Sequence, residues 1–132
     1  MEIAIDFDGT VVTHDYPKVG VSVKAESVLL ELTKQKHNLI LFTMRSGKEL
    51  QDAINWFKNN NIPLYGIQYN PTQKDWTQSN KCYAQMYIDD AALGCPLIAG
   101  KHSRPFVNWR KVKNQLVKQG ILKKPAIKQA IK

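Results

Sequence analysis

Two pairs of aspartates are the residues in this sequence whose spacing most directly suggests chemistry. Asp6 and Asp8 occur in the run Asp-Phe-Asp-Gly-Thr, directly after an apolar stretch, and Asp89 and Asp90 close the run Tyr-Ile-Asp-Asp. Because alternate side chains of a strand point to the same side, Asp6 and Asp8 are expected to share a small space. Like charges in that arrangement repel one another unless a cation compensates, and Mg²⁺ is suitable because it prefers oxygen ligands such as carboxylates.

The segments that must position these aspartates alternate between strand and helix. Buried strands are predicted from four short apolar runs, at residues 2–7, 39–42, 64–69 and 85–88. Helices are predicted between them, at residues 23–36 and over an apolar stripe that ends at the asparagines 59–61. This alternation predicts a Rossmann-like α/β fold, a three-layer α/β/α sandwich with a mainly parallel sheet and helices on both faces. Both aspartate pairs are then expected to converge at the carboxyl ends of strands, where ligands bind in this fold class.

The chain is expected to form one domain over residues 1–132, since its length suits a single hydrophobic core and it contains no linker or repeat. A basic helix and tail are predicted over about residues 105–132, with Pro125 interrupting the helix. Three apolar residues of this helix are expected to dock on the core while three lysines stay in solvent. These residues are Val112, Leu116 and Ile121, and Lys111, Lys113 and Lys118.

The net charge of +8 is concentrated in the C-terminal third of the chain. Residues 1–90 contain 9 Lys and Arg against 11 Asp and Glu, whereas residues 91–132 contain 10 Lys and Arg and no acidic residue. Such an asymmetry can attract an acidic partner such as nucleic acid. A lysine-rich face in contact with solvent is the simpler interpretation, and we favour it before the motifs are considered.

Composition argues against a membrane role. The chain is 43% hydrophobic, but no apolar stretch approaches the roughly 20 residues that a spanning helix needs. The N-terminal run Met-Glu-Ile-Ala-Ile lacks the basic segment of a secretory signal, so a cytoplasmic location is expected. Cys82 and Cys95 lack the spacing of a zinc site and are expected to be reduced thiols.

Thr43 ends the second predicted strand and precedes a helix. Its hydroxyl and the backbone N–H groups that follow could hold an anion, although a threonine here could equally cap the helix near Ser46 and Gly47. Arg45, two residues on, could reach a phosphate with its planar guanidinium group or form a surface salt bridge.

Taken in order, these features resemble the haloacid dehalogenase superfamily of phosphohydrolases. The shared features are Asp-Phe-Asp-Gly-Thr, a strand-ending threonine, a lysine and a strand-ending acid pair, and the likeness spans residues 1 to about 100. It is greatest to small bacterial and phage members with the motifs Thr-x-Arg-x-Gly and Ile-Asp-Asp. Many members carry a cap domain, but the corresponding segments here, about residues 11–21 and 70–80, are too short. The resemblance therefore implies a capless member.

The resemblance also implies roles for individual residues. Asp6 would be the nucleophile that takes the phosphoryl group, and Asp8 would act first as acid and then as base. Lys81 would neutralise the transferring group, with Lys74 in the same loop as the alternative. Phosphate-binding residues are expected to be Gly9, Thr10, Thr43, Met44, Arg45 and Lys81. Mg²⁺ would be held by Asp6, Asp8 (through its backbone carbonyl), Asp89 and Asp90, with Asp89 preferred over Asp90 as the direct ligand.

The function expected from this sequence is that of a Mg²⁺-dependent phosphomonoesterase that acts through an aspartyl phosphate. Without a cap, the open site favours either a macromolecular substrate whose end reaches in, or closure by a second subunit of a homo-oligomer. A small phosphorylated molecule is equally compatible with the motifs. Two alternatives stay open: a phosphatase for nucleic-acid ends, and a non-catalytic phosphate-binding or nucleic-acid-binding module that uses the basic tail. His14 and Tyr16, on the short loop after the first motif, are candidates to touch a substrate.

Overall fold

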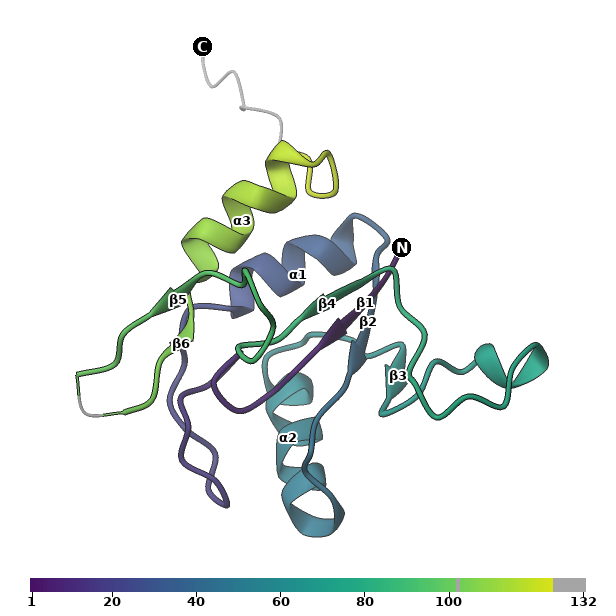
Figure 1. Cartoon of the computed structure of the whole chain (residues 1–132), viewed down its shortest axis with the longest axis horizontal. Helices are drawn as coiled ribbons and strands as arrows, with labels where there is room; N and C mark the ends of the chain where they lie inside the picture. The colour runs from purple at the N-terminus through teal and green to yellow at the C-terminus, as the bar shows by residue number, and fades with distance from the viewer. Residues whose placement is uncertain (102, 125–132) are drawn as a thin grey trace.

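A parallel four-stranded sheet forms the centre of the computed structural model, which describes residues 1–101 and 103–124 (Figure 1). The strands follow the order β3-β2-β1-β4, and they are β1 at Glu2–Ile5, β2 at Asn38–Leu41, β3 at Gly66–Ile67 and β4 at Met86–Ile88. The helices are α1 at Glu26–Lys34, α2 at Gly47–Asn59 and α3 at Trp109–Lys118. A mainly parallel sheet flanked by helices confirms the predicted Rossmann-like α/β fold class.

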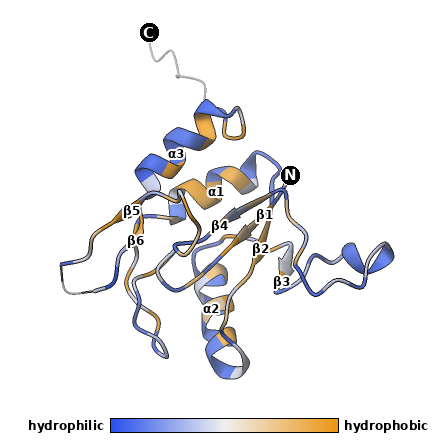
Figure 2. Cartoon of the chain, in the orientation of Figure 1, coloured by the Kyte–Doolittle hydropathy of each residue, from blue (hydrophilic) through white to orange (hydrophobic). Residues whose placement is uncertain are grey.

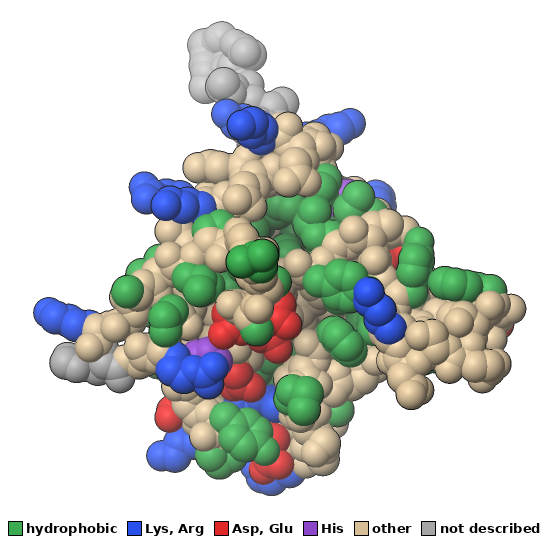
Figure 3. Space-filling model, in the orientation of Figure 1, with side chains coloured by type: hydrophobic (Ala, Val, Ile, Leu, Met, Phe, Trp, Pro, Cys, Tyr) green, Lys and Arg blue, Asp and Glu red, His purple; other side chains and the backbone are tan. Residues whose placement is uncertain are grey.

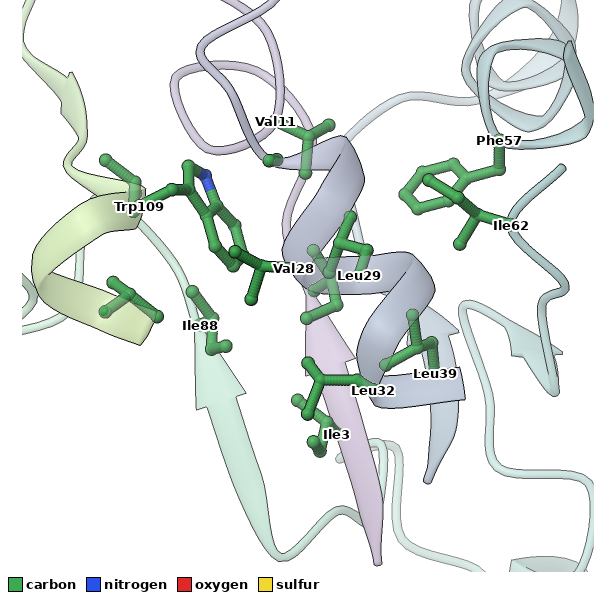
Figure 4. Close-up of a cluster of buried hydrophobic side chains, with 14 of the residues drawn as sticks. Ile3, Val11, Val28, Leu29, Leu32, Leu39, Phe57, Ile62, Ile88 and Trp109 are labelled. Carbon is green, nitrogen blue, oxygen red and sulfur yellow. The ribbon is translucent and has the colours of Figure 1, made fainter. Parts of the chain in front are cut away.

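One face of the sheet carries the hydrophobic core. Ile3, Ile5 and Phe7 are fully buried there, because alternate residues of β1 and its extension point to the same side. All three α-helices supply side chains to this core, and Figure 4 shows α1 lying against β1 with Trp109 on one side and Phe57 on the other. In Figure 2 the strands are largely hydrophobic, whereas the helices have hydrophobic and hydrophilic sides.

The handedness of the crossovers explains why the helices share one face. The chain passes from β1 to β2 and on to β3 in the same direction across the sheet, so two right-handed connections place α1 and α2 on one side. The opposite face, with Ala4 and Ile40, is flanked by the segment between β3 and β4, whose one regular element is the 3-10 helix η1 at Gln73–Asp75. Among the described residues, the helical layer expected on this face is reduced to η1, because the segment is polar and interrupted by Pro71.

Several elements are shorter than the sequence predicts, and β1 covers only Glu2–Ile5 of the predicted run 2–7. α1 starts at Glu26 rather than at residue 23, because the preceding residues take part in other structure: Ser22 forms a bridge with Val12, and Lys24 has a φ of 74° that is incompatible with a helix. β3 covers only Gly66–Ile67 of the predicted run 64–69.

α3 ends before the break predicted at Pro125. The carbonyl of Leu116 accepts hydrogen bonds from the amides of Ile121 and Leu122, at 2.9 and 3.1 Å, and Gly120 between them and the helix has a φ of 74°. The predicted division of the helix is confirmed, since the three lysines are exposed and the three apolar residues are buried or half-buried. Pro125 and the rest of the predicted tail, residues 125–132, lie outside the described residues.

A short antiparallel pair leads into α3 and connects it to the loop after β1. β5 (Leu97–Ile98) pairs with β6 (Phe106–Val107), and no pattern in the sequence predicted this pair. The amide of Val107 donates to the carbonyl of Gly9 at 3.0 Å, and Nε1 of Trp109 donates to the carbonyl of Thr10 at 2.6 Å. Trp109 is 2% exposed, so it docks α3 onto the loop.

Cys82 and Cys95 are both free thiols, the first buried and the second half-buried. Burial raises the pKa of each thiol above its ordinary value, so neither is an activated nucleophile. None of the helices within residues 1–101 and 103–124 combines the length and the apolar character needed to cross a membrane. The cytoplasmic location and the homo-oligomeric state stay predictions.

We expect the substitution Trp109→Phe to lower the free energy of unfolding by about 1–3 kcal/mol, because the buried carbonyl of Thr10 loses its donor. Urea denaturation measures this change. Trp56→Phe is the matched control, since Trp56 packs against Phe57 and its indole N–H makes no hydrogen bond to the described part of the chain. Equal losses in the two variants would contradict the assignment, because ring volume rather than the hydrogen bond would then explain both.

Candidate functional site

Three carboxylates converge at the carboxyl ends of β1 and β4. The two strands pair in a register that sets Ile5 opposite Ile88, so the residues that follow, Asp6 and Asp89, leave the sheet side by side. Together with Asp90 they form a cluster in which one oxygen from each residue lies within 4.8 Å of the other two. Figure 3 shows acidic side chains gathered at the centre of the visible face. We call Asp6, Asp89 and Asp90 the carboxylate cluster.

Thr10 and His14 hold this cluster from the loop after β1. The hydroxyl of Thr10 donates to Oδ2 of Asp6 at 2.9 Å and accepts from the amide of Asp90 at 3.1 Å. Nε2 of His14 lies 2.8 Å from Oδ2 of Asp90. Thr10 is fully buried, so it positions two members of the cluster and is not open to a ligand. This corrects the expectation that Thr10 binds phosphate directly.

Gly9 makes room for the contact between His14 and Asp90. Its φ is +78°, and a Cβ atom at this position would lie 2.0 Å from Nε2 of His14 and 2.5 Å from Oδ2 of Asp90. The amide of Gly9 donates to the carbonyl of Val12 at 2.8 Å. That amide is therefore not available for the phosphate contact expected of Gly9. The role of Gly9 is to let His14 and Asp90 approach the backbone closely.

The electrostatics of the cluster reflect uncompensated negative charge. Burial raises the pKa of Asp6 from 3.8 to about 8, with further contributions from the charge of Asp89 and the hydrogen bond to Asp90, while the Thr10 hydroxyl acts in the opposite direction. Burial also raises the pKa of Asp89. Without a bound cation, the folded chain therefore keeps the Asp6 proton to about pH 8.

The donor set fits a Mg²⁺ ion. Mg²⁺ binds carboxylate oxygens and tolerates a site with only a few protein ligands, because it retains water molecules or takes substrate oxygens at its other positions. The carboxylate of Asp90 already contacts Nε2 of His14 at 2.8 Å and the hydroxyl of Thr10 at 3.4 Å, whereas the carboxylate of Asp89 accepts a hydrogen bond from the amide of Ala91 at 2.8 Å. Asp89 is therefore freer to coordinate an ion directly, which agrees with the order preferred from the sequence.

The side chain of Asp8 lies outside the carboxylate cluster. β1 ends at Ile5, and the chain then turns, with the amide of Thr10 bonded to the carbonyl of Phe7 at 3.0 Å, so strand alternation does not extend to Asp8. Its two oxygens accept hydrogen bonds from Arg45, at 2.8 Å from Nε and 2.7 Å from Nη2. The prediction of four converging carboxylates is therefore wrong, since only three of them meet. The expected metal contact through the backbone carbonyl of Asp8 stays a prediction.

Arg45 is buried, contrary to both roles expected of it. It is 1% exposed, and beyond the pair with Asp8 its guanidinium donates to the carbonyls of Pro17, Lys18 and Glu49. The nearby Asp8 carboxylate raises the pKa of Arg45 further above its ordinary value. With its donors engaged in this way, Arg45 neither forms a surface salt bridge nor reaches a bound phosphate. Its position fixes Asp8.

The loop after β2 is held rigidly by Gln68, a residue that the sequence gave no reason to select. The amide of Thr43 donates to Oε1 of Gln68 at 2.7 Å, and Nε2 of Gln68 donates back to the carbonyl of Thr43 at 2.6 Å. The hydroxyl of Thr43 accepts from the amide of Arg45 at 3.1 Å and does not cap α2. The side chain of Met44 is 98% exposed, so a phosphate contact at this position falls to its backbone.

An open cavity of about 350 Å³ adjoins the carboxylate cluster. Asp6 and Asp89 line one end of it, and Phe42, Lys81 and Tyr87 line the rest together with small apolar residues. Lys74, the alternative lysine, lies on η1 and is not part of this lining. Lys81, rather than Lys74, therefore lines the cavity that adjoins the carboxylates.

Comparison with known proteins supports the fold of this chain and gives no information about the chemistry of its site. No protein-family model matches the chain, and no curated protein matches it significantly. Among solved structures, a conserved protein from Bacteroides thetaiotaomicron is similar, with 30% sequence identity over 91% of each chain and a TM-score of 0.71. The chain belongs to the family of this Bacteroides protein. The description of that protein names no activity or ligand, so the likeness supports the Rossmann-like fold, and the chemistry of the site must be argued from its residues.

We expect the metal-free chain to lose stability as the pH rises from about 4 to 8. The unfolded chain releases the Asp6 proton near pH 3.8 while the folded chain keeps it to about pH 8, so the folded state holds the extra proton across this range. The free energy of unfolding then falls by at most about 1.4 kcal/mol per pH unit from this group. Because Mg²⁺ binds the ionised carboxylates, it should raise Tm more at pH 8 than at pH 5.

Calorimetric scans in EDTA and in millimolar Mg²⁺ measure both effects, and Asp6→Asn provides the control. This variant lacks the titrating group, so its Tm in EDTA should vary less with pH than that of the wild type, and its response to Mg²⁺ should be smaller. A wild-type Tm that depends on pH no more steeply than that of the variant would contradict the assignment.

Proposed function

We propose that this chain is a Mg²⁺-dependent phosphomonoesterase of the haloacid dehalogenase type, with Asp6 as the nucleophile. One observation carries the proposal: three carboxylates from two adjacent strands, Asp6, Asp89 and Asp90, meet at one end of an open cavity that also contains a lysine. When bound, a Mg²⁺ ion held by these carboxylates would supply the positive charge that offsets the phosphoryl oxygens. Lys81 in the cavity lining would add to that charge.

In the first step, a carboxylate oxygen of Asp6 attacks the phosphorus atom. An O–P bond forms to Asp6 while the bond from phosphorus to the leaving oxygen breaks, and the leaving oxygen takes a proton from Asp8. The Thr10 hydroxyl, bonded to Oδ2 of Asp6, fixes the direction in which the carboxylate faces. In the second step, water attacks the aspartyl phosphate, gives its proton to Asp8, and restores the carboxylate of Asp6.

The proton transfers assigned to Asp8 require it to leave Arg45. The two hydrogen bonds from the guanidinium group hold the carboxyl group of Asp8 on Arg45 and outside the carboxylate cluster, so it must turn away from Arg45 to reach a substrate bound there. The side chain of Asp8 is 18% exposed, whereas that of Arg45 is 1% exposed, so Asp8 is the partner with room to turn. Arg45 is a positioning residue in this scheme, because it acts on the substrate only through Asp8.

The loop after β2 offers two donors to a phosphoryl oxygen. The hydroxyl of Thr43 accepts from the amide of Arg45, which leaves its own hydrogen free to be donated. The amides of Thr43 and Arg45 are occupied by the Gln68 and Thr43 side chains, so the amide of Met44 is the backbone donor left in this part of the described chain. These two groups are the phosphate contacts that we assign to the loop.

We expect Asp6→Asn to reduce the rate of phosphate-ester hydrolysis roughly a thousandfold or more, because an amide cannot form the aspartyl phosphate. Hydrolysis of an aryl phosphate in Mg²⁺ measures the rate. Asp15→Asn makes the same change at an exposed position of the loop after β1 and should keep wild-type activity. Turnover that survives in Asp6→Asn, or that is unaffected by EDTA, would rule out the proposed mechanism.

The two lysines provide a matched pair. We expect Lys81→Met to lower kcat by roughly 10²-fold, because it removes a positive charge from the cavity that contains Asp6. Lys74→Met removes the same charge from η1 and should change kcat by less than about twofold, as expected for an exposed surface charge. Steady-state kinetics on both variants decide the assignment, and the reverse order of effects would give the role to Lys74.

A further inference from the structure

The sheet face that lacks an α-helix presents a row of accessible aromatic rings. Phe42, Tyr87, Tyr83 and Trp76 are 36%, 37%, 37% and 62% exposed, and we call them the aromatic track. Phe42 and Tyr87 lie 6.5 Å apart between ring centroids, and Tyr83 and Trp76 lie 5.2 Å apart. Figure 3 shows hydrophobic side chains next to the acidic ones on this face. Large rings left in contact with water in this way indicate a surface that binds something.

The aromatic track is continuous with the carboxylate cluster. The cavity beside Asp6 includes Phe42, Lys81 and Tyr87 in its lining, and a second cavity of about 300 Å³ is lined by Lys81 and Tyr87 again together with Tyr83 and Trp76. The two cavities share Lys81 and Tyr87 in their linings, so they adjoin each other, and together they extend from Asp6 and Asp89 to Trp76. We call the two adjoining cavities the groove. Nζ of Lys81 lies 5.5 Å from the ring centroid of Tyr87, where the charge and the ring can act on the same ligand.

Hydrogen bonds hold two of the four rings, those of Tyr87 and Tyr83, in place before any ligand binds. The hydroxyl of Tyr87 donates to the carbonyl of Cys82, and the hydroxyl of Tyr83 accepts from Nε2 of Gln85 at 2.9 Å. Rings fixed in this way lose little conformational entropy when a flat ligand stacks on them. The track is therefore a preorganised platform.

We propose that the aromatic track binds the last nucleotides of a single-stranded nucleic acid whose terminal phosphate sits at the carboxylate cluster. The inference rests on the proposed function, which assigns the phosphate to that end of the groove. Exposed aromatic rings interspersed with a cation are the means by which proteins hold unpaired bases without reading their sequence. Four rings spread over two cavities extend further than one base requires, which favours an oligonucleotide end over a mononucleotide.

The groove fits this ligand better than it fits a protein partner. Besides the rings, the second cavity is lined by polar residues such as Gln73, Thr77 and Ser79, rather than by the aliphatic residues that fill the core of a stable protein interface. A second copy of the chain seated on the track would also cover the cavity that Asp6 needs for its substrate. The open end of the groove accommodates a chain that continues into solvent.

Nucleic-acid binding on the aromatic track would not depend on the basic C-terminal region. Lys81 is the one cationic side chain that lines the two cavities of the described chain, so binding through stacking should depend weakly on salt. One lysine contact gives a logarithmic slope of roughly −0.7 against salt concentration for single strands, whereas a lysine-rich tail gives several times that value.

The test uses the full chain with Asp6→Asn, so that a phosphorylated probe binds in Mg²⁺ without being hydrolysed. The probe is an oligothymidylate of about eight nucleotides that carries a terminal phosphate at its 5′ or its 3′ end and a fluorophore at the other, and anisotropy gives Kd. Adding Trp76→Ala or Tyr83→Ala should raise Kd about tenfold or more, as expected for the loss of one stacking ring. Tyr65→Ala, which removes a tyrosine that is also 37% exposed but lines a different cavity, should leave Kd unchanged.

Three results would overturn the inference: no binding of either probe, equal loss in the Tyr65→Ala control, or binding that depends on residues 125–132 and not on Trp76. Concentration-dependent dimerisation that Trp76→Ala abolishes would overturn it as well, because the face would then belong to a second copy.

Failure of the proposed function has a separate signature. If the wild type hydrolyses no phosphate ester while Kd still depends on Trp76, the track binds nucleic acid and the phosphatase assignment fails. If it hydrolyses aryl phosphates but binds neither probe, only the inference fails.

Discussion

The in-register pairing of β1 with β4 is the constraint on which the site depends. It sets Ile5 opposite Ile88 and forces the next residues of both strands, Asp6 and Asp89, into one small volume. Repulsion between them works against folding, and the buried core on the other face of the same strands must offset it. The surroundings fit this reading: the Thr10 hydroxyl, His14 and the backbone approach allowed by Gly9 all act on the carboxylate cluster. Nearly every unusual feature near the N-terminus serves this cluster.

The two faces of the sheet have different roles: one carries the hydrophobic core and the other carries the candidate site. One face holds side chains from α1, α2 and α3 and supplies the stability, since its residues are almost fully buried. The other carries the carboxylate cluster at its edge and half-exposed rings across its middle. The short polar segment between β3 and β4 makes this division possible, because an α-helix in that position would cover the rings. Shortening one connection thus opens a surface without disturbing the core.

The fold class and the convergence of Asp6 with Asp89 and Asp90 were predictable, because they depend on local sequence patterns and on general rules for parallel sheets. Apolar runs gave the strands, and the rule that carboxyl ends share one edge brought Asp6 to Asp89 and Asp90. The partner of Asp8 was not predictable, because the chain turns after Phe7 and strand alternation does not extend to Asp8. Contacts between distant parts of the chain also left no pattern: His14 and Asp90 are 76 residues apart, and Trp109 and Thr10 are 99 residues apart. The exposed face of the sheet was not predictable either. It results from the lack of an α-helix between β3 and β4, and the apolar patterns of the strands do not indicate where a helix is lacking.

If Asp8 exchanges protons with a substrate as proposed, the pair formed by Asp8 and Arg45 must have a held state and a released state. In the held state both oxygens of Asp8 are bonded to a guanidinium that is itself fixed by three backbone carbonyls. In the released state the carboxyl group faces the solvent side of the pair. A ligand shifts this balance only by the amount by which it binds the released state more tightly. If the held state outnumbers the released one about a hundredfold, the apparent affinity of a ligand that needs the released state falls by the same factor. In the proposed mechanism, the ion pair would therefore keep Asp8 away from the substrate until a ligand binds tightly enough to shift this balance.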